Sequence, residues 1–303
     1  GVMSQIARGL EEFQTQITST HGFEPFAELA QTTCANVSLS VPAVRRIELA
    51  LDEFFTIRVT LRLLMAHSIQ LHPDFADKTL PSGLNTMHEL LGRLPDSLET
   101  ERLSKRSRRV GAICMETRPS VILIEAYRQA RLMCLRDFNR ASDLCINGDP
   151  LDVFLHGDCS SLRSHSALID TGFPYVDVHL FFMFFEVLKN ALMASIHTTN
   201  DNDELPPIHA SLIHGSSLLY ENERTVKISD SGEGIRRSDV HKVWSYFYSN
   251  RSGPNLEADR EVERGHHARG LGLPVSRVLV RYFGGELDIN SIPTLGSDVF
   301  IYL

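Results

Sequence analysis

The order of apolar and polar residues divides the chain into two parts. In the first part, apolar residues recur at helical spacing over residues 6–17 and again over 41–71, where Pro42 suits a first helical turn. Another long helix is expected over residues 121–135. We find no strand-like alternation in this part, so residues 1–140 are predicted to form a helical bundle.

The pattern changes after a turn-rich segment at residues 145–150. Short runs with a period of two, which are typical of strands, then appear between further helices. The strands are expected at residues 208–213, 218–220, 225–229, 286–290 and 298–302. Strands in neighbouring hairpins together with a few helices favour an α+β domain over residues 141–303, with helices on one face of the sheet.

A strongly apolar helix is expected to begin near Leu180, and it carries a polar stripe. Glu186, Lys189 and Asn190 are spaced i, i+3 and i+4, so they share one helical face. These three groups suit a metal-bound phosphate: the amide oxygen would bind the metal, the ammonium would approach the phosphate, and the carboxylate would act as a base. The alternative interpretation is a helix that extends its polar ends to water.

Asp230 follows the strand expected at residues 225–229, and Gly232 and Gly234 come shortly after it. The glycines would let the backbone turn tightly past a flat ligand. The carboxylate could accept a hydrogen bond from an amino group such as the adenine N6. An ordinary turn would have the same residues, so this motif alone does not establish a nucleotide site.

A second glycine motif opens the helix expected to run through Val280. Glycines before a helix N-terminus expose N–H groups and the positive end of the helix dipole to a phosphate. The spacing matches neither a dinucleotide-binding fingerprint nor a Walker loop, and a plain helix start remains the alternative. The motif consists of Gly270, Leu271, Gly272, Leu273 and Pro274.

Two further segments lie near these motifs in the sequence. Residues 248–268 are polar and contain glycine, arginine and histidine, which is the character of a mobile lid over phosphates. Ser297 precedes the last expected strand, where its hydroxyl could meet a nucleotide or simply belong to a turn.

Composition narrows the class of protein. The 303 residues are 43% hydrophobic and 22% charged, as in ordinary globular proteins. The net charge of −8, without a basic stretch interleaved with aromatic residues, disfavours nucleic acid as a partner. No apolar run is long enough for a membrane span. Five scattered cysteines argue against a disulfide framework or a zinc site, and no signal-peptide pattern follows Gly1.

The motifs follow one another in a characteristic order: Glu-x-x-x-Asn on a helix, Asp-x-Gly-x-Gly, a polar lid, Gly-x-Gly-x-Pro, and Gly-Ser before a strand. This series resembles the N, G1, G2 and G3 boxes of the GHKL ATPase/kinase superfamily. The more specific resemblance is to the mitochondrial 2-oxoacid dehydrogenase kinases, and it extends over most of the chain. Residues 62–67, 173–194, 270–283 and 296–303 carry it. Residues 175–180 and 248–249 look more like pyruvate dehydrogenase kinase than the branched-chain enzyme.

The resemblance implies a four-helix-type bundle followed by a GHKL-type (Bergerat) α/β sandwich. It implies a protein serine kinase that uses ATP and Mg²⁺, with K⁺ as a further ion of the family. The substrate would be the E1α subunit of a mitochondrial 2-oxoacid dehydrogenase, most similar to pyruvate dehydrogenase. The lipoyl domain of the E2 core would be a partner of the bundle, the protein would be a homodimer, and the location would be the mitochondrial matrix.

The resemblance also implies roles for individual residues. Glu186 would take the proton of the substrate hydroxyl, with Lys189 nearby to keep it ionised, and Asn190 would hold Mg²⁺. His67 would orient Glu186 across the domain boundary, or it is simply a buried histidine of the bundle. The nucleotide would contact Asn190, Asp230, Gly232, Gly234, Gly270, Leu271, Gly272, Leu273 and Ser297.

The chain departs from the family pattern at several positions. Met193 stands where the family commonly has arginine, and Glu233 and Ala268 stand where it has glycine. The chain stops at Leu303, without the extended C-terminal tail of pyruvate dehydrogenase kinases. Three other functions stay open: a branched-chain 2-oxoacid dehydrogenase kinase, a histidine kinase, and a non-catalytic nucleotide-binding scaffold. A histidine kinase is disfavoured because Ser68, not an acidic residue, follows the histidine.

Overall fold

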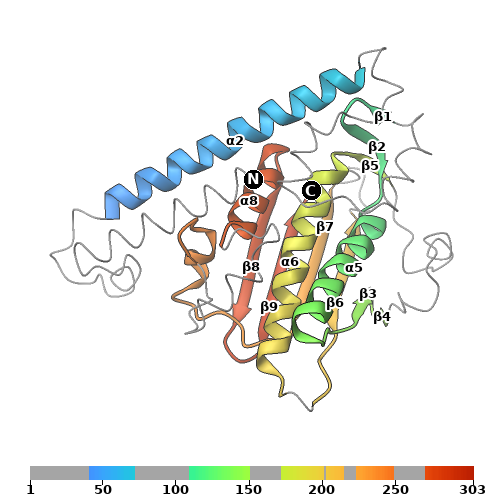
Figure 1. The fold of residues 1–303 in the computed structure, drawn as a ribbon, viewed down its shortest axis with the longest axis vertical. Helices are drawn as coiled ribbons and strands as arrows, with labels where there is room; N and C mark the ends of the chain where they lie inside the picture. The colour runs from blue at the N-terminus through green and yellow to red at the C-terminus, as the bar shows by residue number, and fades with distance from the viewer. Residues whose placement is uncertain (1–40, 72–108, 151–171, 201–202, 215–222, 249–269) are drawn as a thin grey trace.

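The computed structural model describes residues 41–71, 109–150, 172–200, 203–214, 223–248 and 270–303. Within these ranges, a six-stranded sheet is covered on one face by three helices, and a long helix crosses over their upper end (Figure 1). The helices are α2 (Val41–Leu71), α5 (Pro119–Phe138), α6 (Asp177–Thr198) and α8 (Gly272–Tyr282), with a 3₁₀ helix, η4 (Val240–Trp244). The fold class predicted from the sequence, α+β, is confirmed.

The large sheet has the strand order β4-β3-β6-β7-β9-β8. Its strands are β3 (Leu144–Ile146), β4 (Asp149–Pro150), β6 (Ile208–His214), β7 (Arg224–Asp230), β8 (Glu286–Ile292) and β9 (Gly296–Tyr302). Only the β3–β6 pair among these is parallel. Asp230 at the end of β7 lies opposite Ser297 on β9, and Ser297 lies opposite Ser291 on β8. The register therefore places one residue from each of three neighbouring strands in a row at one end of the sheet.

Helix α6 is the centre of the core. Its apolar residues face α5 on one side and α8 on the other, and Leu180, Phe184, Leu188 and Leu192 are fully buried. By length and composition α6 is the one helix among the described residues that could cross a membrane. Most of it is buried inside the protein, as in the core helix of a globular domain.

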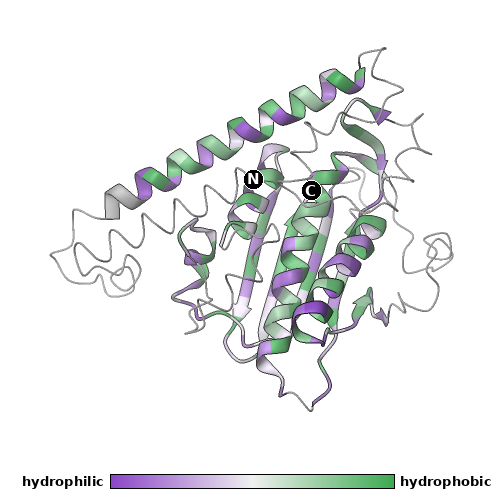
Figure 2. Cartoon of the chain, in the orientation of Figure 1, coloured by the Kyte–Doolittle hydropathy of each residue, from purple (hydrophilic) through white to green (hydrophobic). Residues whose placement is uncertain are grey.

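Helix α2 has the boundaries that its apolar spacing and Pro42 predicted. Figure 2 shows hydrophobic and hydrophilic residues mixed along its length, and several of its large apolar residues are exposed. Phe55 and Val59 are buried, and the ring of Phe55 stacks on that of Tyr246, just after η4, with the centroids 5.2 Å apart. The sequence predicts a helical bundle over residues 1–140. Within residues 1–108, α2 is the segment that the structure describes.

The expectation that residues 109–117 contain no strands is wrong. They form a hairpin of β1 (Arg109–Val110) and β2 (Ile113–Thr117), and β2 pairs with β5 (Phe173–Tyr175) in a small second sheet. Gly111, with φ +57°, makes the turn. Arg118 precedes a proline and is therefore restricted to extended conformations, which ends the strand before α5 begins.

Candidate functional site

The polar stripe of α6 is divided between the protein interior and the surface. The Nζ of Lys189 donates a short hydrogen bond to Oε2 of Glu186, and the two side chains are only 12% and 9% exposed. Lys189 also lies over the ring of Phe185, with Nζ 5.6 Å from the centroid. Asn190, by contrast, is exposed. The stripe is therefore a buried ion pair beside an accessible amide, and it does not extend the Glu186 carboxylate to water as the alternative interpretation required.

The Glu186 carboxylate lies against the first residue of α8. A Cβ added to Gly272 would overlap the carboxylate, so any larger residue there would displace the Glu186 side chain from its present position. The preceding Gly270 has φ +75°, and Leu271 anchors the turn because it is only 2% exposed. The first N–H groups of a helix have no partner within the helix and carry its positive end. The packing therefore brings a carboxylate and an anion-binding helix start together.

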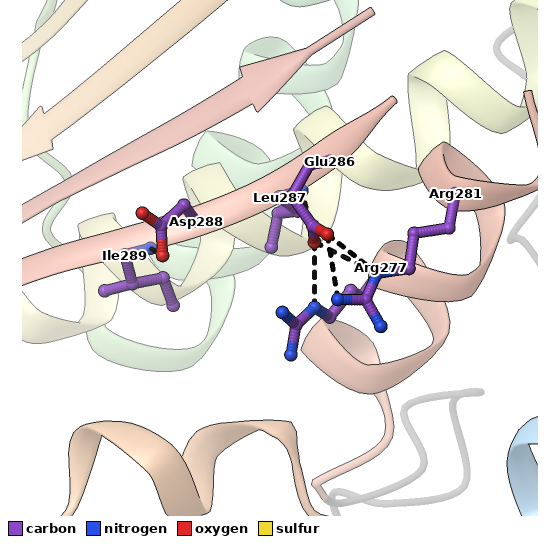
Figure 3. Close-up of polar contacts among 6 residues, drawn as sticks. All are labelled: Arg277, Arg281, Glu286, Leu287, Asp288 and Ile289. Atoms are coloured by element: carbon purple, nitrogen blue, oxygen red, sulfur yellow. Dashed lines mark hydrogen bonds and ion pairs between the residues drawn. The ribbon is translucent and has the colours of Figure 1, made fainter. Parts of the chain in front are cut away.

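Helix α8 is held in this position by its other end and by η4. Figure 3 shows Arg277 and Arg281 of α8 converging on Glu286 at the start of β8. The Nε of Arg277 lies 2.9 Å from Glu286 Oε1, and its guanidinium lies 4.4 Å from the centroid of the Trp244 ring. Burial would raise the pKa of Glu286, but hydrogen bonds from Arg281 and Arg277 outweigh it and lower that pKa. The glycine turn before α8 thus begins a helix fixed on two sides.

Asp230 lies at the end of β7, on the face of the sheet that the helices cover. Its Oδ1 accepts a hydrogen bond from the N–H of Gly232 at 2.9 Å. Burial raises the pKa of Asp230, and the N–H groups of Gly232 and Ser297 act in the opposite direction. The carboxylate is thus partly buried and hydrogen-bonded by backbone donors, an arrangement that keeps it in one orientation.

The loop after Asp230 packs on the same helix that carries Glu186. A Cβ added to Gly232 would lie 2.7 Å from the Cβ of Ala194, and Gly234 has φ +67°. Glu186 and Ala194 are eight positions apart, which is about 12 Å along a helix axis. One face of α6 therefore connects the Asp230 loop with the start of α8, and this suits an elongated ligand better than a single ion.

The contacts that the structure describes for His67 are with the β1–β2 turn. Its Nδ1 accepts a hydrogen bond from the N–H of Ala112 at 3.4 Å, and a Cβ added to Gly111 would overlap its ring. The contacts described for His67 are thus with the β1–β2 turn, whereas those of Glu186 are with Lys189 and the start of α8. They favour the interpretation of His67 as a packed histidine, and its predicted role toward Glu186 stays a prediction.

Sequence reasoning missed Ser291. It continues the inward positions of β8 after Leu287 and Ile289, and its Oγ lies 2.9 Å from that of Ser297. A polar residue at a core-facing position of an alternating strand was the signal that could have found it. Of the departures from the family pattern, Met193 is buried and Glu233 is exposed. The predicted lid, apart from residue 248, and Ala268 lie outside the described residues.

Comparison with known proteins identifies the C-terminal part. Residues 176–303 match the family model of the histidine kinase-, DNA gyrase B- and HSP90-like ATPases. This segment belongs to the GHKL superfamily. As the superfamily is one of nucleotide-binding ATPase domains, the row at Asp230 and the start of α8 are candidates for the ends of an ATP site.

The whole chain is similar to mitochondrial pyruvate dehydrogenase kinases, as its sequence motifs predicted. It is 30% identical over 260 residues to the [pyruvate dehydrogenase (acetyl-transferring)] kinase of Arabidopsis thaliana, covering 84% of this chain and 56% of that protein. It is 30% identical over 202 residues to the Drosophila melanogaster kinase, covering 65% and 43%. It is 25% identical over 303 residues to isozyme 3 of Homo sapiens, covering 100% and 58%. The chain thus spans about half the length of the curated relatives it matches.

Proposed function

We propose that this protein is an ATP-dependent protein serine kinase that phosphorylates the E1α subunit of a mitochondrial 2-oxoacid dehydrogenase complex, pyruvate dehydrogenase. One observation supports this most strongly. The Glu186 carboxylate is held by Lys189 against the glycine start of α8, on the same helix as the accessible Asn190. A base, a phosphate-binding helix start and a metal-binding amide are the parts that phosphoryl transfer needs. The named relatives indicate the class of acceptor.

The proposed chemistry divides among few residues. Asp230 accepts a hydrogen bond from the adenine amino group, and the N–H groups at Gly270 and Gly272 donate to phosphate oxygens. Glu186 accepts the proton of the attacking serine hydroxyl. Lys189 keeps that carboxylate in one orientation through the ion pair. Gly232 and Gly234, with Leu271, Leu273 and Ser297, shape the walls of the site.

Mg²⁺ would supply charge neutralisation between the phosphates. Asn190 fits this ion because its amide is accessible, and a single protein oxygen suits a cation that otherwise binds phosphates and water. Among the described residues no group of three His, Cys, Asp or Glu side chains forms a metal cage. For K⁺ we assign no residue, and its use is proposed from the family alone.

The partners, the location and the domain boundary complete the proposal. By the resemblance to 2-oxoacid dehydrogenase kinases, the helical domain would bind the lipoyl domain of the E2 core and the protein would act as a homodimer. The names of the relatives support a location in the mitochondrion, and the matrix is proposed from the same resemblance. We predicted a domain boundary at residue 140. Helix α5 packs along α6 and shares its core, which favours a boundary before Arg109 instead.

A phosphotransfer experiment tests the proposed function. Purified protein is incubated with γ-labelled ATP, Mg²⁺ and either pyruvate dehydrogenase E1 or branched-chain E1. We expect acid-stable phosphoserine on E1α, more on the pyruvate enzyme. Faster labelling of branched-chain E1 would transfer the assignment to that enzyme. Acid-labile phosphohistidine on the protein itself would indicate a histidine kinase, and no transfer despite ADP binding would indicate a non-catalytic scaffold.

A further inference from the structure

Ser291 uses the full hydrogen-bonding capacity of a hydroxyl group. Its Oγ lies 2.7 Å from the N–H of Ile235, 3.1 Å from the carbonyl oxygen of Gly296 and 2.9 Å from Oγ of Ser297. A serine hydroxyl has one proton to donate and two lone pairs that accept. The N–H of Ile235 can only donate and the carbonyl of Gly296 can only accept. The remaining lone pair of Ser291 is therefore left for the proton of Ser297.

This assignment sets the direction of the Ser297 hydroxyl. Its proton points along the sheet toward Ser291, so its own lone pairs point away from that contact. Ser297 lies directly opposite Asp230 in the β7–β9 pair, and both continue the core-facing positions of their strands. The row Asp230, Ser297 and Ser291 thus ends in two neighbouring hydrogen-bond acceptors, a carboxylate and a hydroxyl oxygen.

Ser291 also connects the two segments that carry these acceptors. Its bond to Ile235 attaches the loop after β7, and the N–H of Thr294 donates to the carbonyl of Glu233 at 2.6 Å. A Cβ added to Gly234 would overlap the carbonyl oxygen of Ile292, so the loop and the β8–β9 hairpin are in direct contact. The loop N–H of Gly232 in turn holds Asp230. Removing the Ser291 hydroxyl would affect both acceptors.

We propose that Ser291 is a positioning residue that makes the site specific for a 6-amino purine, because it directs the Ser297 hydroxyl to present an acceptor beside Asp230. An amino group at position 6 brings donors to these two acceptors, directly or through one water. A 6-oxo purine replaces this donor with an acceptor and moves its proton to N1, so the two protein acceptors would no longer meet a donor at position 6. The inference depends on the proposed nucleotide site and specifies which base that site selects.

The test compares ligands that differ at position 6 or lack the base. Calorimetry on the full chain measures Mg·ADP, Mg·IDP and Mg·pyrophosphate binding to wild type and Ser291→Ala. We expect ADP to bind about three- to tenfold more weakly to the variant, the usual range for one lost hydrogen bond. The preference for ADP over IDP should narrow by a similar factor, and pyrophosphate affinity should not change.

Four further variants control for a merely structural effect. Ser229→Ala removes a hydroxyl from the opposite face of the same sheet end and should bind all three ligands as wild type does. Ser291→Thr retains the hydroxyl and should restore most of the ADP preference. Ser297→Ala should reproduce the loss, and the double variant should be no worse than Ser297→Ala alone, because the effect of Ser291 passes through Ser297. If Ser291→Ala folds poorly, Ser297→Ala compared with wild type on the same three ligands still tests whether the Ser297 hydroxyl carries the ADP preference.

The outcomes separate this inference from the proposed function. If wild type binds no ADP, both are wrong. If wild type prefers ADP and Ser291→Ala leaves the ADP/IDP ratio unchanged, the specificity role of Ser291 is wrong and the nucleotide site stands. Equal weakening of ADP, IDP and pyrophosphate would likewise overturn the inference, since it would show that Ser291 only supports the fold.

Discussion

The two ends of the proposed nucleotide site are built in different ways. At the sheet end, Asp230, Ser297 and Ser291 come from three paired strands, and backbone N–H groups or hydroxyls hold each of them. At the helix end, the Glu186–Lys189 ion pair lies on an apolar helix against the start of α8. The sheet end has directed acceptors in fixed register, which suits recognition. The helix end has a base and the first N–H groups of a helix, which suits chemistry on phosphate.

This contrast implies that the two ends should fail differently when they are changed. A variant at the helix end should slow phosphotransfer while the nucleotide still binds. A variant at the sheet end should weaken binding of the adenine base, and phosphotransfer should recover at high nucleotide concentration. The predictions below test this separation, beginning with the largest expected effect.

Glu186→Gln should abolish most of the activity. Glutamine keeps the volume and can still accept a hydrogen bond from Lys189, but it cannot take the proton of the attacking hydroxyl. We expect phosphotransfer to fall by roughly 10²–10⁴-fold, the usual contribution of a general base, while Mg·ATP affinity stays within a few-fold. Steady-state kinetics and calorimetry measure the two quantities.

The matched control is Glu125→Gln on the neighbouring α5. Glu125 is also buried and is also paired with a basic residue at i+3, Arg128, but it lies on a different helix from the proposed base. It should leave the rate unchanged. A Glu186→Gln variant with near wild-type activity would exclude Glu186 as the base and turn attention to His67.

Asn190→Ala should lose mainly Mg²⁺-dependent nucleotide binding, whereas Glu186→Gln should lose mainly the phosphotransfer rate.

Asp230→Ala should give the next largest effect, at the other end of the site. It removes the acceptor for the adenine amino group and should weaken ADP binding by about 1.5–3 kcal/mol, or roughly 10–150-fold. The maximal rate at saturating ATP should change little. Asp288→Ala is the control, since Asp288 is an exposed aspartate on β8 that likewise accepts a neighbouring backbone N–H, from Ile289 at 2.9 Å. Unchanged ADP affinity in Asp230→Ala would remove this residue from the site.

The helix end shows what a sequence can and cannot predict. The spacing of Glu186 and Lys189 predicted their shared face, because neighbours at i and i+3 meet on any helix. It could not predict that Gly272, far along the chain, meets the same carboxylate, because that contact depends on how α6 and α8 pack. The nucleotide site was inferred from motif order, and the helix-to-helix contact within it needed the structure.

The strands likewise show which features a sequence pattern predicts and which depend on pairing. Alternation predicted the core of β7 and β9 because these strands bury every second residue. It missed the hairpin at residues 109–117, where the strands are short and their pairing with β5 decides their conformation. Ser291 was missed for a related reason: its role depends on register with β9, which a single strand pattern does not contain.

The pH dependence of ADP binding should report on Asp230, at the sheet end of the site. Burial raises the pKa of Asp230 above its ordinary value of 3.8. The adenine amino group needs the ionised carboxylate, so ADP affinity should fall as the pH falls through this raised pKa. Calorimetry of ADP between pH 7 and 4.5 in wild type and Asp230→Asn measures it. The part of the pH dependence that disappears in Asp230→Asn is due to Asp230. Pyrophosphate affinity, measured in parallel, should not show this part of the pH dependence.

The same shift predicts the sign of a stability effect. A carboxyl group with a raised pKa in the folded state destabilises that state once it ionises. Without ligand, wild type should therefore lose stability relative to Asp230→Asn as the pH rises through the pKa of Asp230. Melting temperatures across this range check the sign. If wild type instead becomes more stable relative to Asp230→Asn as the pH rises, the pKa of Asp230 is lowered in the folded state. That result would contradict the raised pKa expected for a partly buried carboxylate.

The smallest expected effect concerns α2, which lies beside the helix end without belonging to the site. The Tyr246 hydroxyl donates to Asp52 of α2 at 2.5 Å, and burial together with this hydrogen bond raises the pKa of Tyr246. Tyr246→Phe keeps the ring stacked on Phe55 and removes only the hydroxyl. Since Asp52 is exposed and can bind water instead, we expect a loss of only about 1 kcal/mol in the free energy of unfolding, measured with urea. Tyr302→Phe, at an exposed strand end, should cost less. ADP affinity should not change in either variant. A change in Tyr246→Phe alone would show that the packing of α2 is energetically coupled to nucleotide binding. The two ends of the site would then not act independently of this helix.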